Sequence, residues 1–164
     1  MIAMAVVGGS RLMIADEPTS ALDVSIQAQI LRLLREIRRD QGSSLLLITH
    51  DLGVAAENCD RIVVMYAGRI VESGPVREIF NRPAHPYTDK LLRALPTLGK
   101  ASLEAIPGTV PDLIEPPPGC RFSNRCDAAT RQCRTERPPL TDLRNDHAIA
   151  CYHPLCEHQP VAVG

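Results

Sequence analysis

Two adjacent carboxylates follow a short apolar run near the start of the chain. Residues 12–15 carry no charge, which is typical of a strand buried on both faces of a parallel sheet, and Asp16 and Glu17 fall where that strand ends. Ligands bind at this edge of open α/β sheets. Because side chains alternate along a strand, one carboxylate can face a metal on the phosphates while the other faces the attacking water. The pattern predicts a nucleotide site, although Asp16-Glu17-Pro18 alone also fits a strand that ends in an acidic turn.

Four cysteines in the second half of the chain form another candidate site. They are separated by five, six and seventeen residues and stand among arginines, prolines and polar residues rather than on an apolar stripe: Cys120, Cys126, Cys133 and Cys151. This setting favours metal ligands over unrelated buried thiols. No two of the four have the short spacing of paired structural zinc ligands. Zinc nevertheless remains open, because Cys151-Tyr-His153 and Cys156-Glu-His158 each offer sulfur and nitrogen close together.

The composition limits the classes of function. The chain of 164 residues has a net charge of -1, so no basic field predicts binding to nucleic acid or an electrostatic attachment to anionic lipid. No apolar run reaches the length that spans a bilayer, and no signal peptide is evident. We therefore expect a cytoplasmic chain without direct bilayer insertion. In that compartment thiols stay reduced, so the six cysteines need a reason other than disulfides.

The two carboxylates need a framework, and periodicity predicts one. Residues 25–41 form an amphipathic helix that Asp23 or Ser25 can cap and that Gly42 ends. The apolar strand 45–49 follows and ends at His50, which completes a strand–helix–strand unit. The remaining expected elements are a buried helix at 1–7, short helices at 52–58, 75–80 and 87–95, strands at 61–66 and 69–72 joined through Ala67-Gly68, and a proline-rich connector at 96–118.

The first half of the chain resembles ABC-type ATPases. Asp16-Glu17-Pro18, then Thr-Ser-Ala-Leu-Asp23, a helix, and a strand ending in His50-Asp51 match the Walker B, D-loop and switch-histidine series of that family. The resemblance implies that Asp16 holds Mg²⁺ through water, that Glu17 polarises the hydrolytic water and that His50 contacts the γ-phosphate of ATP. It also implies that Ser20 and Asp23 belong to the D-loop at the dimer interface.

The second half narrows the resemblance to ATPases of oligopeptide and dipeptide importers. Gly-Arg-Ile-Val-Glu-Ser-Gly-Pro at 68–75 and His-Pro-Tyr-Thr at 85–88 are similar to the end of that ATPase domain. Pro-Gly-Cys-Arg-Phe-Ser-Asn-Arg-Cys at 118–126, Cys133 and His147-Ala-Ile-Ala-Cys151 are similar to its C-terminal extension. By this resemblance Cys120, Cys126, Cys133 and Cys151 ligate a 4Fe-4S cluster, with zinc as the alternative metal, and Cys156 falls outside the match.

The expected fold class is α/β: the C-terminal part of a P-loop ABC ATPase domain, with parallel strands, helices and a small hairpin, followed by a loop-rich extension that carries cysteines. The expected divisions are a partial ATPase domain at 1–80, a helix and connector at 81–118 and a Cys-rich extension at 119–164. The sequence contains no G-x-x-x-x-G-K-[ST] phosphate loop, Q-loop or signature segment. We interpret the chain as a truncated gene, a split gene or a misplaced start, inactive until joined to an N-terminal half.

The implied function is ATP hydrolysis that drives import of oligopeptides or dipeptides. The implied cofactors are ATP, Mg²⁺ and the 4Fe-4S cluster. The implied partners are a second ABC ATPase subunit and integral membrane permease subunits. These partners place the chain at the cytoplasmic face of the membrane. We expect no nucleic acid as a partner. The alternative is a metal-binding structural or redox module, with iron-sulfur or zinc, whose ATPase half is vestigial.

Overall fold

The computed structural model describes residues 10–20, 22–95, 105–143 and 146–155. Contacts divide the chain into unit 1, Met1–Cys59, and unit 2, Asp60–Gly164, and each is described by itself. The expected helix at 1–7, the start of the proline-rich connector, Cys156 and His158 lie outside the described residues.

Unit 1 contains the predicted strand–helix–strand arrangement. Strand β1 (Leu12–Asp16) pairs in parallel with β2 (Ser44–Ile48), so that Leu12 lies opposite Ser44 and Asp16 opposite Ile48. Helix α2 (Val24–Gln41) connects the two strands, and α3 (Leu52–Asn58) follows β2. The ends of both strands therefore meet at one edge of the pair, which is where the candidate residues Glu17 and His50 follow.

The ends of α2 are those that the sequence predicts. Asp23 is the N-terminal cap, because its Oδ1 accepts a hydrogen bond from the Ile26 N–H at 3.0 Å. Gly42 ends the helix in the left-handed region, with φ 59°. Leu31 and Leu34 are the buried residues of the helix, whereas Leu33 is 41% exposed. The spacing of the buried positions still follows the helical repeat.

The expectation that the first strand is buried on both faces is wrong for this structure. Met13 is 8% exposed, whereas its neighbours Leu12 and Ile14 are 53% and 61% exposed. Alternate side chains point to opposite faces, so only one face of the two-stranded sheet is covered. The uncharged run predicted the strand correctly, but it did not predict that one face of the strand is exposed.

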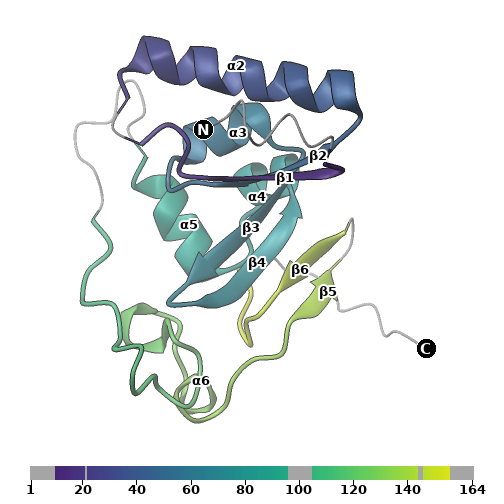
Figure 1. Ribbon diagram of the computed structural model, residues 1–164. Coiled ribbons are helices and arrows are strands. Elements are labelled where there is room, and N and C mark those ends of the chain that lie inside the picture. The colour runs from purple at the N-terminus through teal and green to yellow at the C-terminus, as the bar shows by residue number, and fades with distance from the viewer. Residues whose placement is uncertain (1–9, 21, 96–104, 144–145, 156–164) are drawn as a thin grey trace. The chain divides into compact units, whose positions relative to one another are not determined.

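Unit 2 is built on a four-stranded antiparallel sheet, in which the strands lie side by side in the order β3-β4-β6-β5 (Figure 1). The strands are β3 (Arg61–Tyr66), β4 (Arg69–Pro75), β5 (Thr141–Leu143) and β6 (His147–Ile149). The predicted hairpin turn is present: Ala67 and Gly68 have φ values of 48° and 75°. Positive φ at both central residues is the geometry of the tight type I′ turn that suits twisted strands.

Short helices complete unit 2. These are α4 (Val76–Asn81), α5 (Pro86–Arg93), the 3-10 helix η1 (Ser123–Arg125) and α6 (Arg131–Thr135). Helices α4 and α5 lie near their predicted positions. Among the helices of the described residues, none is long and apolar enough to cross a membrane.

The Cys-rich segment has a hydrophobic core, which the sequence analysis did not expect. Besides contributing β5 and β6 to the sheet, it buries Phe122 completely. The Phe122 ring lies 5.1 Å from the Tyr66 ring of β3 and 5.3 Å from the Tyr87 ring of α5, measured between centroids. These three rings are three of the five aromatic residues in the chain. The few aromatic side chains are thus concentrated where the extension packs on the hairpin.

Candidate functional site

Glu17 occupies a constrained backbone position at the end of β1. Its N–H donates to the carbonyl oxygen of Ile48 at 2.9 Å, which continues the pairing of the two strands by one residue. Its φ is 45°, in the left-handed region that non-glycine residues rarely adopt. Strain of this kind persists where the surrounding structure fixes it, and it is common at functional positions.

The Glu17 carboxylate is held by two side chains. His50, two residues after β2, places Nδ1 2.7 Å from Glu17 Oε1, and the Ser20 hydroxyl donates to Oε2 at 2.7 Å. The pair is open to solvent, because the His50 side chain is 82% exposed and that of Glu17 37% exposed. Ser20 is placed by the turn after the strand, where its N–H donates to the Glu17 carbonyl oxygen. Two carboxylate oxygens with two fixed donors give a charged group of defined orientation.

These hydrogen bonds shift the protonation of both partners. The bond from Ser20, and then the bond from His50, lower the pKa of Glu17. The bond to Glu17, followed by its charge, raises the pKa of His50. Both shifts favour the pair of a carboxylate and an imidazolium. The arrangement therefore holds Glu17 as an ionised carboxylate.

The two other predicted residues of this site, Asp16 and Asp23, do not take part in the contacts between Glu17, Ser20 and His50. The Asp16 side chain is exposed and has no hydrogen-bond partner in the part of the chain that the structure describes. Asp23 caps α2, so its predicted role at a dimer interface would come in addition to a structural one. Unit 1 thus brings together Glu17, Ser20 and His50, and it leaves the Asp16 carboxylate available to a ligand.

Substitution of Glu17 by glutamine is expected to lower the pKa of His50 towards the ordinary value. The amide removes the negative charge that stabilises the protonated His50 ring, and a neutral side chain stabilises that ring less. Histidine proton resonances followed through a pH titration of the 164-residue chain measure this shift. Glu36→Gln, on the exposed face of α2, is the matched control. An unchanged His50 titration in Glu17→Gln would contradict the paired geometry.

The four predicted cysteine ligands line one cavity in unit 2. Cys120, Cys126, Cys133 and Cys151 contribute to its wall together with His85 and Phe122. The loops approach closely: the Cys120 N–H donates to the Cys133 carbonyl oxygen at 2.8 Å. Gly119 permits this contact, because a Cβ there would lie 2.3 Å from that same oxygen. The structure therefore gathers residues that are as many as 31 positions apart in the sequence.

Polar side chains lie next to Cys133, and burial favours the protonated form of three of the thiols. The Thr130 hydroxyl lies 3.4 Å from Cys133 Sγ and 3.1 Å from His153 Nε2. Burial raises the pKa of the Cys120 and Cys126 thiols, and it raises the pKa of Cys151 to about 12. Thiols in such a setting are protonated at neutral pH, so a metal that binds here must release protons.

The thiols are not arranged as a compact site for one ion. Among the residues with described positions, no three Cys, His, Asp or Glu side chains form a group that could hold a single metal ion. A tetrahedral zinc site needs its ligands about 2.3 Å from one centre. An iron-sulfur cluster binds each thiolate to a different iron, so it sets the thiolates farther apart.

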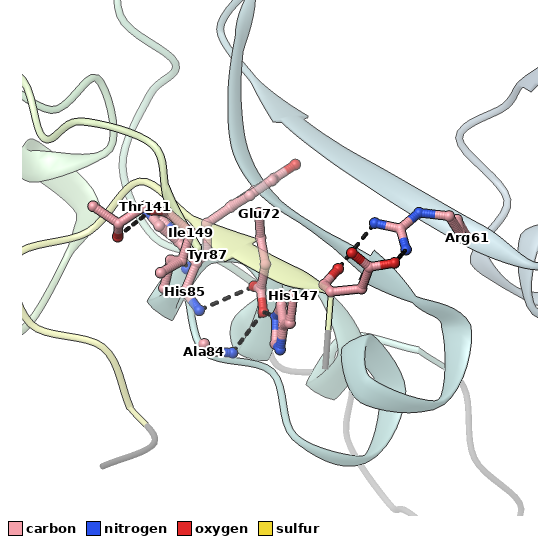
Figure 2. Close-up of polar contacts among 9 residues, drawn as sticks. Arg61, Glu72, Ala84, His85, Tyr87, Thr141, His147 and Ile149 are labelled. Carbon is pink, nitrogen blue, oxygen red and sulfur yellow. Dashed lines mark hydrogen bonds and ion pairs between the residues drawn. The ribbon is translucent and has the colours of Figure 1, made fainter. Parts of the chain in front are cut away.

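Close to the cavity, sequence reasoning missed a buried acidic residue. Figure 2 shows the carboxylate of Glu72, on β4, facing His147 and the backbone at Ala84 and His85. Glu72 Oε1 accepts from Ala84 N–H and from His147 Nε2, each at 2.7 Å, and Oε2 accepts from His85 N–H at 3.0 Å. Glu72 and His147 are completely buried. The only sign of this buried group in the sequence was a glutamate within an apolar strand. That sign did not predict which residues hydrogen-bond to the glutamate.

The chain is similar to ATP-binding proteins of peptide transport. A family model described as "Oligopeptide/dipeptide transporter, C-terminal region" matches residues 71–133. A putative peptide import ATP-binding protein of Brucella ovis is 51% identical over 158 residues, which cover 92% of this chain and 47% of that protein. The dipeptide transport ATP-binding protein DppD of Escherichia coli is 49% identical over 157 residues, 94% of this chain and 48% of DppD. The chain spans about half the length of these relatives.

A solved structure shows a partial likeness. The protein cbiO1 of Clostridium perfringens, described as part of the ABC transporter complex cbiONQ, is 33% identical, with a TM-score of 0.46. The match covers 49% of this chain and 32% of that one.

Proposed function

We propose that the chain is the C-terminal part of an ATP-binding subunit of an ABC-type oligopeptide or dipeptide importer, and that it supplies the water-activating half of the ATPase site. The observation that carries the proposal is the Glu17 carboxylate, oriented by His50 and Ser20 at the end of paired parallel strands. An ionised, exposed carboxylate at this edge suits a general base for a nucleotide.

In the proposed mechanism each side chain has one task. Glu17 accepts a proton from the attacking water, and His50 orients Glu17 and contacts the γ-phosphate of ATP. The exposed Asp16 carboxylate would hold Mg²⁺ through water, and the ion would supply neutralising charge at the phosphates. Ser20 and Asp23 form the D-loop towards a second ATPase subunit. The phosphate cradle has no counterpart in the 164 residues, so the rest of the subunit must provide it.

The proposed setting is a transporter that couples hydrolysis to import of oligopeptides or dipeptides. The partners are a second ABC ATPase subunit and integral membrane permease subunits, and the subunit acts at the cytoplasmic face of the membrane. In this proposal residues 1–80 serve the ATPase, residues 81–118 connect, and residues 119–164 form the Cys-rich extension.

We also propose that Cys120, Cys126, Cys133 and Cys151 hold a 4Fe-4S cluster. The chemistry of the donor set supports this proposal, because four cysteine side chains line one cavity and a 4Fe-4S cluster takes four thiolates. When bound, the cluster cross-links the loops that carry these residues. The cavity has a volume of about 10 Å³, close to that of one water.

A chimera tests the proposed ATPase function. The N-terminal half of DppD from Escherichia coli is joined to this chain in place of the matching part of DppD, and the product is expressed in a strain that lacks DppD. We expect ATP hydrolysis and growth on a dipeptide as the only source of a required amino acid. A chimera that folds and binds ATP but supports neither would reject the proposal, and an iron-containing product without turnover would favour a metal-binding module with a vestigial ATPase half.

Loss of one proposed ligand is expected to remove the cluster. The chain is purified without oxygen, and iron, acid-labile sulfide and zinc are measured per chain. Cys133→Ser should lose the iron and the sulfide together, because Cys133 lies in the wall of the cavity. Cys59→Ser, in unit 1, is the matched control and should keep both. Stoichiometric zinc without sulfide would contradict the cluster.

A further inference from the structure

His85 carries a buried donor that the fold does not use. The residue caps α5, and its Nδ1 accepts a hydrogen bond from the Tyr87 N–H at 3.0 Å. An Nδ1 that accepts cannot carry a proton, so the hydrogen of the neutral ring must be on Nε2. The imidazolium is excluded by the same contact, because it would set two N–H groups against each other. Burial also lowers the pKa of His85 to about 4, in agreement with a neutral ring.

The Nε2–H of this tautomer has no acceptor within the described residues. His85 is 1% exposed, and its Nε2 is among the buried polar atoms without a hydrogen-bond partner. Buried donors are nearly always paired, and an unpaired one is costly. An N–H that is fixed in direction and has no acceptor among the described residues points to an acceptor beyond them.

The surroundings of His85 limit the chemistry of that acceptor. His85 lines the cavity whose wall carries Cys120, Cys126, Cys133 and Cys151. The Phe122 ring, 5.9 Å from the His85 ring between centroids, offers no acceptor of comparable strength. Protonated thiols accept hydrogen bonds weakly. Thiolates and sulfides bound to iron carry negative charge, and a charged acceptor forms a stronger hydrogen bond.

We propose that His85 Nε2–H donates a hydrogen bond to sulfur of the metal group held by the four cysteines and thereby sets its reduction potential. This inference rests on the cluster proposed above and concerns a positioning residue rather than a ligand. A hydrogen bond to the sulfurs stabilises the more negative, reduced state of the cluster, so it raises the reduction potential. The competing occupant is an ordered water, for which the cavity has room.

Two substitutions separate the donor from the helix cap. In His85→Asn, Oδ1 replaces Nδ1 as the acceptor for Tyr87 N–H, while the donor at the position of Nε2 is lost. In His85→Gln, the longer side chain carries an N–H towards the position of Nε2 but gives up the cap. If His85 only caps α5, the His85→Asn variant should behave like the wild type. If His85 only donates to the bound sulfur, the His85→Gln variant should behave like the wild type.

The experiment uses the full 164-residue chain, purified without oxygen, and measures iron, sulfide and the reduction potential in a spectroelectrochemical titration. We expect a lower potential in His85→Asn, with iron and sulfide retained, and a potential near the wild-type value in His85→Gln. With ¹⁵N-labelled histidine, pulsed EPR of the reduced chain should show a nitrogen coupling that His85→Asn abolishes. An unchanged potential and coupling in His85→Asn would overturn the hydrogen bond and leave the cluster standing. A wild-type chain without iron and sulfide would overturn both.

Discussion

In the DppD chimera, Glu17→Gln is expected to reduce ATP turnover by roughly a hundred- to ten-thousand-fold, the usual contribution of a general base. The amide keeps the shape of the side chain and can still meet Ser20 and His50, but it cannot accept a proton from water. ATP affinity should be unchanged, because Glu17 contributes to the chemical step rather than to the phosphate cradle.

The measurement pairs the hydrolysis rate with nucleotide affinity in the same preparation. Glu36→Gln removes an exposed carboxylate on α2 and serves as the control, with turnover like that of the parent chimera. His50→Ala should lower turnover as well, since Glu17 then loses the partner that orients it. Parent-like turnover in Glu17→Gln would remove Glu17 from the site.

Glu72→Ala is expected to destabilise unit 2 by about 3–5 kcal/mol, the usual cost of removing one partner of a buried pair. Three donors lose their acceptor at once: Nε2 of His147 and the backbone N–H groups of Ala84 and His85. Urea unfolding of the 164-residue chain, followed by circular dichroism and amide exchange in β4 and β6, measures the loss. A change below 1 kcal/mol would contradict this account.

The same sheet offers a matched control. Arg61 Nη1 donates to Asp146 Oδ2 at 2.9 Å, but the two side chains are 50% and 84% exposed. An exposed pair of this kind contributes about 0–1 kcal/mol, so Asp146→Asn should barely move the unfolding midpoint. Replacing Glu72 and His147 together by leucine should recover only part of the loss, because the two backbone donors remain without an acceptor.

Local patterns predicted much of unit 1 and the hairpin of unit 2. The helix 25–41, with Asp23 or Ser25 as its cap and Gly42 at its end, was predicted from neighbouring residues. The structure has the helix at Val24–Gln41, confirms the Gly42 end and shows that Asp23 is the cap. The hairpin through Ala67-Gly68 is equally local. The resemblance to ABC-type ATPases implied that Glu17 and His50 share a site. In the structure the two side chains meet, because Glu17 directly follows β1, His50 comes two residues after β2, and these strands pair in parallel.

Long-range packing was beyond these patterns. The prolines and cysteines of residues 119–151 predicted a loop-rich segment without a packed core. In the structure Phe122 joins an aromatic cluster and His147 hydrogen-bonds to Glu72. Tyr66 lies 56 positions before Phe122 and Glu72 lies 75 positions before His147, and periodicity carries no information about such pairs. Likewise the exposure of Leu12 and Ile14 depends on what lies against the second face of the strand, which a run of apolar letters does not specify.

The order of the strands also has a consequence for synthesis on the ribosome. Strand β4 pairs with β6, and the contact from Glu72 to His147 spans 75 positions. At 5–20 residues per second, His147 is made about 4–15 s after Glu72. During that interval Glu72 lacks its partner His147, and the edge of β4 lacks the neighbouring strand β6. An unpaired strand edge can pair with a wrong segment. The sheet can therefore be completed only after the segment that ends at Ile149 has left the ribosome.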